Sequence, residues 1–448
     1  MEHSTVIDAP IADVFEWHRR PGAIERLIPP WQPLHVLSEA QSLSSGTAVL
    51  GLPLGIRWSA RHLPSEYRDG ARFVDRLDTP ILRNLVPWTH EHCFEPISDT
   101  STLVTDRVIT RVPDGVLAQN LAYRGRQLSG DLAAHRAAAD AGGVPMTVAV
   151  TGSSGLIGSA LCAFLSTGGH RVVRLVRSTP GSSSGSGIDQ RHWDPDDPSP
   201  DLLDGVDAVV HLAGEPVAGR FDAAHKRAVH DSRIGPTRRL AEIMGGRTFV
   251  VASAVGIYGP DRGDEILTER SERGDGFLAD VVSDWEAAAD PARESHSRVT
   301  HVRTGIVQSP RGGVLRLLRP IFEIGAGGRI GDGRQWTPWI GIDDMVDIYL
   351  RCLVDQRLSG PVNAVAPTPV TNRDYTKVLA HVLRRPALVP VPSIGPRALF
   401  GAEAVHEFVA AGQRVDPASL AAVGHEFRHA TLEPALRHLL GRVRLDVA

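Results

Sequence analysis

The segment that most constrains this chain is Met146–Gly158, which reads MTVAVTGSSGLIG. A short β-rich apolar run leads into a glycine turn, and a helical pattern begins near Leu156, so the segment predicts strand, turn and helix. Gly152, Gly155 and Gly158 have the spacing that allows a sharp turn, close approach of a pyrophosphate and close helix–strand packing. Free backbone N–H groups at the start of the helix favour the binding of a phosphate group. We therefore predict a dinucleotide site with loop contacts Gly152, Ser153, Ser154, Gly155, Leu156, Ile157 and Gly158.

Further β-rich runs alternate with helical patterns after this segment. The runs are Arg171–Val176, Asp207–Leu212, Thr248–Ser253 and Val299–Ile306. Strands that alternate with helices through short connections predict an α/β fold with a doubly wound parallel Rossmann sheet. Ligands of such sheets lie at the carboxyl ends of the strands. Further cofactor contacts are therefore expected at Leu212, Ala213, Gly214 and Ala252.

The residues after the second strand indicate which dinucleotide is bound. An NAD site usually carries Asp or Glu near this strand end, where the carboxylate accepts from the ribose 2′-hydroxyl. Here Arg177 and Ser178 stand instead. A cation and a hydroxyl suit a 2′-phosphate through charge-assisted hydrogen bonds. The sequence therefore predicts NADP(H); the alternative is that Arg177 is a solvated loop residue and cofactor specificity is loose.

Residues 1–143 have a different pattern. Short β-rich runs between positions 36 and 112 are separated by Gly, Pro, Asp and Ser, which predicts a curved antiparallel sheet. Val116–Ala139 has apolar residues at roughly helical spacing, so a long amphipathic helix closes the unit. Ala141–Pro145 is a plausible linker. Six aromatic residues either line a cavity or simply pack the core: Trp17, Trp31, Trp58, Phe73, Trp88 and Phe94.

Helix, sheet and a closing long helix resemble the START-like, helix-grip (polyketide-cyclase-like, SRPBCC) domains, and the opening STVIDAPIADVFEWHRRPGAIERLIPPW is similar to their first strand and helices. The resemblance implies an apolar small-molecule cavity. The later stretches VTGSSGLIGSAL, VVHLAGEPVAGRF, SAVGIYG, VRTGIV and WTPWIGIDDMVDIYL resemble the atypical, epimerase-like subgroup of extended short-chain dehydrogenases/reductases, sometimes labelled cell division inhibitors. That subgroup implies a small helical C-terminal domain. The expected domains are residues 1–143, 146–390 and 391–448.

One departure from the superfamily concerns catalysis. The resemblance implies a Tyr-x-x-x-Lys pair for proton transfer, but Phe277 and Val281 stand at those positions. Ser253 aligns with the helper hydroxyl and is a predicted catalytic residue. Tyr258 is either a substitute proton donor or a packing or substrate-contact residue. Substrate contacts are expected at Arg303, Trp336 and Trp339, with Asp343 nearby; Arg303 alternatively forms only a salt bridge.

Composition and charge narrow the classes of function that remain for this protein. The net charge of −4 gives no basic field for nucleic acid or anionic membranes. The three cysteines are far apart and the histidines show no familiar ligand spacing, so neither disulfides nor a metal site is expected. The absence of a signal-like or bilayer-length apolar run indicates a cytoplasmic protein. The leading hypothesis is an NADP(H)-binding epimerase or oxidoreductase of non-standard design, acting on a nucleotide sugar or another carbonyl or carbinol compound. The alternative is a non-catalytic NADP-binding sensor whose N-terminal domain holds an apolar molecule.

Overall fold

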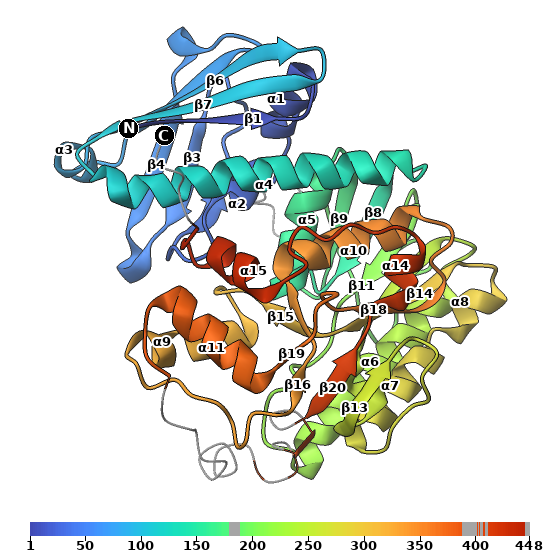
Figure 1. The fold of residues 1–448 in the computed structure, drawn as a ribbon. Coiled ribbons are helices and arrows are strands. Elements are labelled where there is room, and N and C mark those ends of the chain that lie inside the picture. The colour runs from blue at the N-terminus through green and yellow to red at the C-terminus, as the bar shows by residue number, and fades with distance from the viewer. Residues whose placement is uncertain (179–188, 388–400, 402, 404–405, 408–410, 444–448) are drawn as a thin grey trace.

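The computed structural model describes residues 1–178, 189–387, 401, 403, 406–407 and 411–443. Two seven-stranded sheets dominate this part of the chain (Figure 1). The first sheet is antiparallel and is built from residues 2–110, and the second is parallel and is built from residues 147–364. The long helix α4 (Asp114–Asp140) runs between them in Figure 1.

The antiparallel sheet has the order β1-β7-β6-β5-β4-β3-β2. Its strands are β1 (Glu2–Ile7), β2 (His35–Ser38), β3 (Thr47–Gly51), β4 (Arg57–His62), β5 (Arg72–Leu77), β6 (Trp88–Ser98) and β7 (Ser101–Thr110). Helices α1 (Ile11–Arg19) and α2 (Ala23–Leu27) follow β1, and α3 (Leu82–Leu85) precedes β6. Alternation along β7 buries one face, with Val104 and Val108 inward. Phe15, Trp17 and Phe94 pack the core beside this face.

The parallel sheet has the order β10-β9-β8-β11-β12-β14-β18, so the predicted doubly wound α/β sheet is confirmed. Its strands are β8 (Thr147–Thr151), β9 (Arg171–Val176), β10 (Asp189–His192), β11 (Ala208–His211), β12 (Thr248–Ala254), β14 (Val299–Thr304) and β18 (Gly360–Ala364). Helices α5 (Leu156–Thr167) and α10 (Ile342–Val354) contribute to one core cluster. Helices α6 (Ala223–Glu242), α7 (Phe277–Ala287) and α8 (Asp290–Glu294) contribute to a second cluster. Because β8, β11 and β12 supply both clusters, these strands are buried on both faces.

Smaller elements surround the carboxyl ends of the parallel strands. They are η3 (Val255–Tyr258), β13 (Asp261–Leu267), β15 (Ile306–Gln308), α9 (Gly313–Glu323), β16 (Trp336–Thr337), β17 (Trp339–Gly341), β19 (Val370–Thr371) and α11 (Asn372–Leu383). The described part of the C-terminal segment contains β20 (Gly412–Val415), α14 (Ala418–Ala422) and α15 (Leu432–Leu439). β20 pairs with β13, and α15 packs against α11. The expectation of a helical C-terminal domain falls partly outside the described residues and stays a prediction.

A buried charge network joins the two sheets' units and the C-terminal segment. Arg26 of α2 donates to both oxygens of Asp131 at 2.8 and 2.7 Å and to Asp343 of α10 at 2.9 Å. Arg428, which precedes α15, donates to Asp131 at 2.8 Å and to both oxygens of Asp347 at 2.6 Å. Three segments that are distant in sequence are therefore linked through shared carboxylates.

Candidate functional site

The glycine loop between β8 and α5 has the geometry expected for a pyrophosphate cradle. Gly152 has a φ of 64°, and a Cβ there would lie 2.8 Å from the carbonyl carbon of Leu212. A Cβ on Gly158 would lie 2.2 Å from the oxygen of Gly152, so the third glycine permits the close packing of helix on loop. Gly155 has an ordinary φ of −73°, so its backbone conformation does not require glycine. Its missing side chain instead leaves space for a ligand beside the loop. Among the described residues, no side chain caps the start of α5, which leaves its N–H groups free for an anion.

Neighbouring strand ends are fastened to this loop. The buried hydroxyl of Thr151 accepts from the backbone N–H groups of Leu212 at 3.0 Å and Ala213 at 3.2 Å. The turn after β11 is held from the other side by Arg233, which donates to the carbonyl oxygen of Glu215 at 2.8 Å. These contacts hold the predicted cofactor residues 212–214 beside the glycine loop, at the carboxyl edge of the sheet.

Arg177 and Ser178 directly follow β9 and are exposed. β9 pairs with β8 in a register that places Leu175 opposite Thr151, so Arg177 lies at the same edge of the sheet as the glycine loop. An exposed guanidinium at this edge is available to a ligand phosphate. The local geometry therefore agrees with the position from which a 2′-phosphate would be recognised.

A second set of predicted residues meets at the ends of β12 and β14. Ser253 donates a short hydrogen bond of 2.6 Å to Glu286 of α7. Arg303 donates from Nε and Nη2 to the two oxygens of the same carboxylate, each at 2.9 Å. The Arg303 Nη1 also donates to the hydroxyl of Tyr258 at 3.1 Å, and that hydroxyl donates to Asn363 at 2.7 Å. The structure thus joins Ser253 and Arg303 through Glu286, and Tyr258 joins the network through Arg303.

The electrostatics of this network favour an ionised Glu286. Burial alone would raise the pKa of this carboxyl, but hydrogen bonds and charge from Arg303 outweigh burial and lower the pKa. Burial raises the pKa of Tyr258 more than Arg303 lowers it. Tyr258 is fully buried, and its hydroxyl both donates and accepts within the protein. This arrangement favours a positioning role for Tyr258 over proton donation to a ligand.

The two positions that replace the expected dyad lie on α7. Phe277 begins the helix, and Val281 is buried one turn later. The Nζ of Lys226 lies 5.0 Å from the centre of the Phe277 ring and also pairs with Glu403. A cation is therefore present near the dyad position, but it comes from α6 rather than from α7.

The remaining predicted substrate residues occupy different environments. Trp336 is half-buried, donates from Nε1 to Asp264 at 2.8 Å and has Arg414 over its ring. Trp339 is 1% exposed and packs in a core cluster, with Nε1 donating to the Thr368 carbonyl oxygen at 3.0 Å. Asp343 belongs to the buried network with Arg26. Trp336 is thus the more accessible of the two tryptophans.

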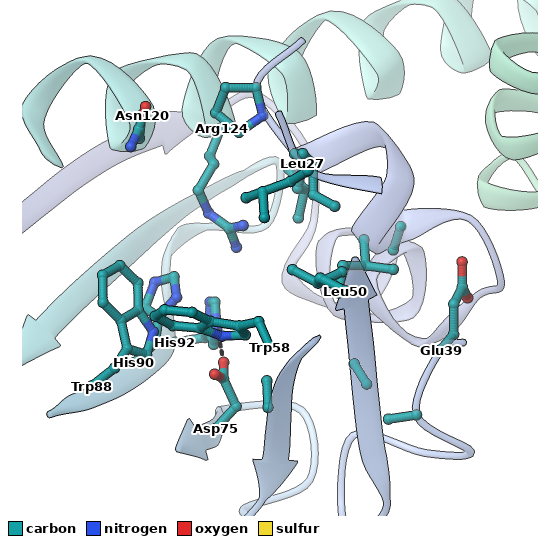
Figure 2. Close-up of a pocket in the computed structure, with 18 of the residues that line it drawn as sticks. Leu27, Glu39, Leu50, Trp58, Asp75, Trp88, His90, His92, Asn120 and Arg124 are labelled. Atoms are coloured by element: carbon teal, nitrogen blue, oxygen red, sulfur yellow. Dashed lines mark hydrogen bonds and ion pairs between the residues drawn. The ribbon is translucent and has the colours of Figure 1, made fainter. Parts of the chain in front are cut away.

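Two hollows accompany these residues. A cleft of about 910 Å³ extends from the glycine loop, at Ser154 and Gly155, to Arg311 and Arg316 near the start of α9. A separate cavity of about 470 Å³ lies in the N-terminal unit, between the antiparallel sheet and helices α2 and α4. Figure 2 shows its lining, with Arg124 extending from a helix towards the strands. Of the six aromatic residues considered in the sequence, Trp58, Phe73 and Trp88 line this cavity.

Sequence reasoning missed two groups of polar residues. Glu286 stands on α7, but nothing in the neighbouring sequence marks it as the partner of Ser253, which lies 33 residues away. Asp75, His90, His92 and Asp106 line or adjoin the floor of the N-terminal cavity. The signal for this second group was the spacing of His90-Glu91-His92 within a β-rich run, since alternate residues of a strand face the same side.

The fold and these sites define a protein with a Rossmann-type dinucleotide-binding unit. A model of the NAD dependent epimerase/dehydratase family matches residues 148–366, and a domain of unknown function (DUF1731) matches residues 391–439. An epimerase family protein of Mycobacterium tuberculosis is 42% identical over 301 residues, which cover 66% of this chain and 98% of that relative. The chain belongs to the NAD-dependent epimerase/dehydratase family, in its atypical short-chain dehydrogenase/reductase branch.

Two solved structures extend the comparison. The crystal structure of the nucleoside-diphosphate sugar epimerase from Corynebacterium glutamicum is 44% identical, with a TM-score of 0.87, and the match covers 100% of this chain and 91% of that one. The structure of human epimerase family protein SDR39U1 (isoform 2) with NADPH is 30% identical, with a TM-score of 0.59, and covers 66% of this chain and 100% of that one. The first similarity includes the antiparallel sheet. Within the described residues, no helix has the length and apolarity needed to cross a bilayer.

Proposed function

We propose that this chain is an NADP(H)-dependent epimerase or oxidoreductase that acts on a nucleotide sugar or a similar carbonyl or carbinol compound through a non-standard acid–base group. The observation that carries the proposal is the short contact between Ser253 and an ionised Glu286, at the strand end where the superfamily places its catalytic hydroxyl. The printed description of the C. glutamicum relative supports the substrate class.

The choice of NADP(H) is supported by Arg177 and by the human relative's structure with NADPH. The glycine loop would hold the pyrophosphate at the start of α5, and Arg177 and Ser178 would hold the 2′-phosphate. When bound, the dinucleotide supplies or accepts a hydride. The protein positions the two reacting groups beside one another and handles the proton.

Ser253 and Glu286 are assigned to the proton. A serine hydroxyl that donates to a carboxylate can receive a proton from a substrate carbinol while its own proton moves to the carboxylate. Arg303 keeps Glu286 ionised and fixed in orientation, and Tyr258 supports Arg303 through its hydroxyl. Ser253 and Glu286 are thus proposed as catalytic residues, and Tyr258 as a positioning residue.

The test has a binding arm and a turnover arm. Titration of wild type and Arg177→Ala with NADPH and NADH should show that wild type prefers NADPH and that the variant loses about one to two decades of NADPH affinity alone, as expected for a charge-assisted contact of about 1.5–3 kcal/mol. Turnover of candidate nucleotide sugars should fall in Ser253→Ala and Glu286→Gln without loss of NADPH binding. Equal affinity for both cofactors, or unchanged turnover in both variants, would refute the corresponding assignment.

A second candidate function concerns the N-terminal unit. The curved antiparallel sheet closed by α4 supports a START-like, helix-grip domain, and the 470 Å³ cavity supports binding of an apolar small molecule. On this alternative, the parallel-sheet unit binds NADP(H) without turnover and the whole chain acts as a sensor. A stable NADPH absorbance with every carbonyl substrate, together with a small molecule retained by the purified protein, would favour the sensor over the enzyme.

A further inference from the structure

We propose that the N-terminal cavity contains a divalent transition-metal site formed by Asp75, His90 and His92, with an open coordination position that faces the cavity. This site is separate from the dinucleotide unit and does not depend on the function proposed for that unit. Figure 2 shows the three side chains gathered at one end of the cavity, beneath Arg124.

The antiparallel sheet places these side chains on one face. His90 and His92 are alternate residues of β6, so both face the cavity. Asp75 of β5 stands directly opposite His90 in the ladder, and Asp106 of β7 stands directly opposite His92. Directly opposed residues of an antiparallel pair share a face. The cluster is therefore built on three adjacent paired strands, a rigid support for metal ligands.

The distances suit a small metal ion. One ligand atom from each of Asp75, His90 and His92 lies within 4.8 Å of those of the other two, and all three residues are buried. The His92 Nε2 lies 3.3 Å from an oxygen of Asp75. That spacing is long for a charged hydrogen bond, but it equals the separation of about 3.3 Å between two ligand atoms around a tetrahedral ion with bonds of about 2.0 Å.

Asp106 supplies the outer support that metal-binding histidines usually have. Its Oδ1 lies 2.9 Å from the Nε2 of His90 in a hydrogen bond. The same oxygen lies 2.8 Å from the Nδ1 of His92, although this contact is poorly aligned for a hydrogen bond. A carboxylate on the far nitrogen of a ligating histidine fixes the ring orientation and raises ligand basicity. Asp106 is thus a positioning residue for both imidazoles.

The charge around the cluster favours a cation. Asp75 and Asp106 carry two negative charges, and the nearest permanent positive charge is Arg124, whose Nε lies 3.6 Å from Asp106. His18 and His62 also line the cavity, but their Nδ1 atoms are occupied by backbone oxygens at 2.8 and 2.9 Å. Two carboxylates and one guanidinium leave a net negative charge in an apolar cavity, and a bound cation would balance it.

The ligand set also indicates what the ion would do. Two imidazoles and one carboxylate are typical of zinc or non-haem iron sites that keep coordination positions open. Here the open side faces Trp58, Trp88 and the apolar residues of the cavity. The site would therefore accept an oxygen-donor group, such as a carboxylate or hydroxamate, on a molecule whose apolar part fills the cavity.

The test uses the untagged full-length chain, stripped of metal by a chelator and titrated with Zn²⁺ by calorimetry. Wild type should bind one ion per chain at this site. His92→Ala and His90→Gln should weaken that binding by more than about 100-fold, and Asp106→Asn by about 10- to 100-fold, as outer-shell changes do. His35→Ala, an exposed histidine of the same sheet, should bind as wild type does. NADPH affinity should be unchanged in the three cluster variants, which would show that their effects are local.

Cobalt distinguishes an open site from a closed one. The Co²⁺ form of wild type should show visible d–d absorption that shifts when acetohydroxamate is added, and His90→Gln should not. If His92→Ala fails to fold, His90→Gln carries the test because glutamine can still donate to Asp106. The absence of stoichiometric Zn²⁺ binding by wild type would overturn the proposal. Equal binding by His35→Ala and His90→Gln would also overturn it, because the ion would then reside elsewhere on the protein.

Discussion

Removal of Arg26 should strongly destabilise the protein. Arg26 is 5% exposed, and its guanidinium makes three aligned contacts, two with Asp131 and one with Asp343. Asp131 is fully buried, and Asp343 is nearly so. In Arg26→Ala these two carboxylates lose a charged partner but stay out of water. Breaking a buried ion pair by removing one partner costs about 3–5 kcal/mol.

The remaining contacts place the expected loss near the lower end of that range. Arg428 still donates to Asp131 at 2.8 Å, and Gln127 donates to Asp131 and Asp343 at 3.0 Å each. Among the described residues, Asp343 keeps His438 at 3.6 Å and the longer-range charge of Arg428. We therefore expect a loss of about 3 kcal/mol, most of it due to Asp343. Arg26→Lys keeps the charge without the planar fork and should lie between wild type and Arg26→Ala.

The assay is urea unfolding followed by far-UV and near-UV circular dichroism, with limited proteolysis of the 141–146 connection. Arg83→Ala removes an exposed pair with Asp78 and should change the unfolding free energy by less than about 1 kcal/mol. Because the network joins the N-terminal unit to α10, Arg26→Ala should also make the connection easier to cleave. A loss no larger than that of Arg83→Ala, with unchanged cleavage, would refute the view that this network couples the units.

Three further outcomes are expected. Gly155→Val should fold but should no longer bind NADPH in a fluorescence titration, and retained NADPH affinity would contradict the loop assignment. Gly158→Ala should instead be destabilised, because its Cβ would lie 2.2 Å from the Gly152 oxygen. Glu286 has a lowered pKa, so its stabilisation is present above about pH 4.5 and is lost below; melting temperatures should fall less from pH 7 to pH 3 in Glu286→Gln. Burial raises the pKa of Asp347 to about 7, so the stability that its proton provides is lost as pH rises from about 4 to 7. Asp347→Asn should therefore gain in melting temperature relative to wild type as pH rises from about 4 to 7, and a constant difference would contradict this.

Elements with strong local patterns were predictable from sequence. The expected range for β9 coincides with the observed strand, because the segment combines β-branched apolar residues with clear turn residues beside it. β10 was missed because its residues, DQRH, carry no apolar signal, and pairing to β9 alone makes it an edge strand. β18 was missed because it begins with Gly-Pro, which normally marks a turn. These strands form because they pair with other strands of the sheet, and a short stretch of sequence does not contain that information.

The same division applies to the sites. The glycine loop lies within one short segment, so the spacing of its residues predicts its geometry. The pairing of Ser253 with Glu286 joins a strand to a helix, and that of Arg26 with Asp343 spans 317 positions. Such pairs depend on the packing of whole elements. Asp75 and His92 meet for a similar reason, because sheet register rather than sequence spacing places them together.

The replacement of the Tyr-x-x-x-Lys pair has a chemical consequence if Ser253 and Glu286 carry the proton. A tyrosine held near a lysine can donate or accept, since its pKa approaches the working pH. Glu286 has a lowered pKa and is ionised at neutral pH, so it can accept a proton but has none to give. The site would then favour removal of a proton from a carbinol during oxidation by NADP⁺. At neutral pH, reduction of a carbonyl would require the proton that Glu286 received during the oxidation. The proton and the hydride would then both stay in the site between oxidation and reduction, as an epimerisation requires.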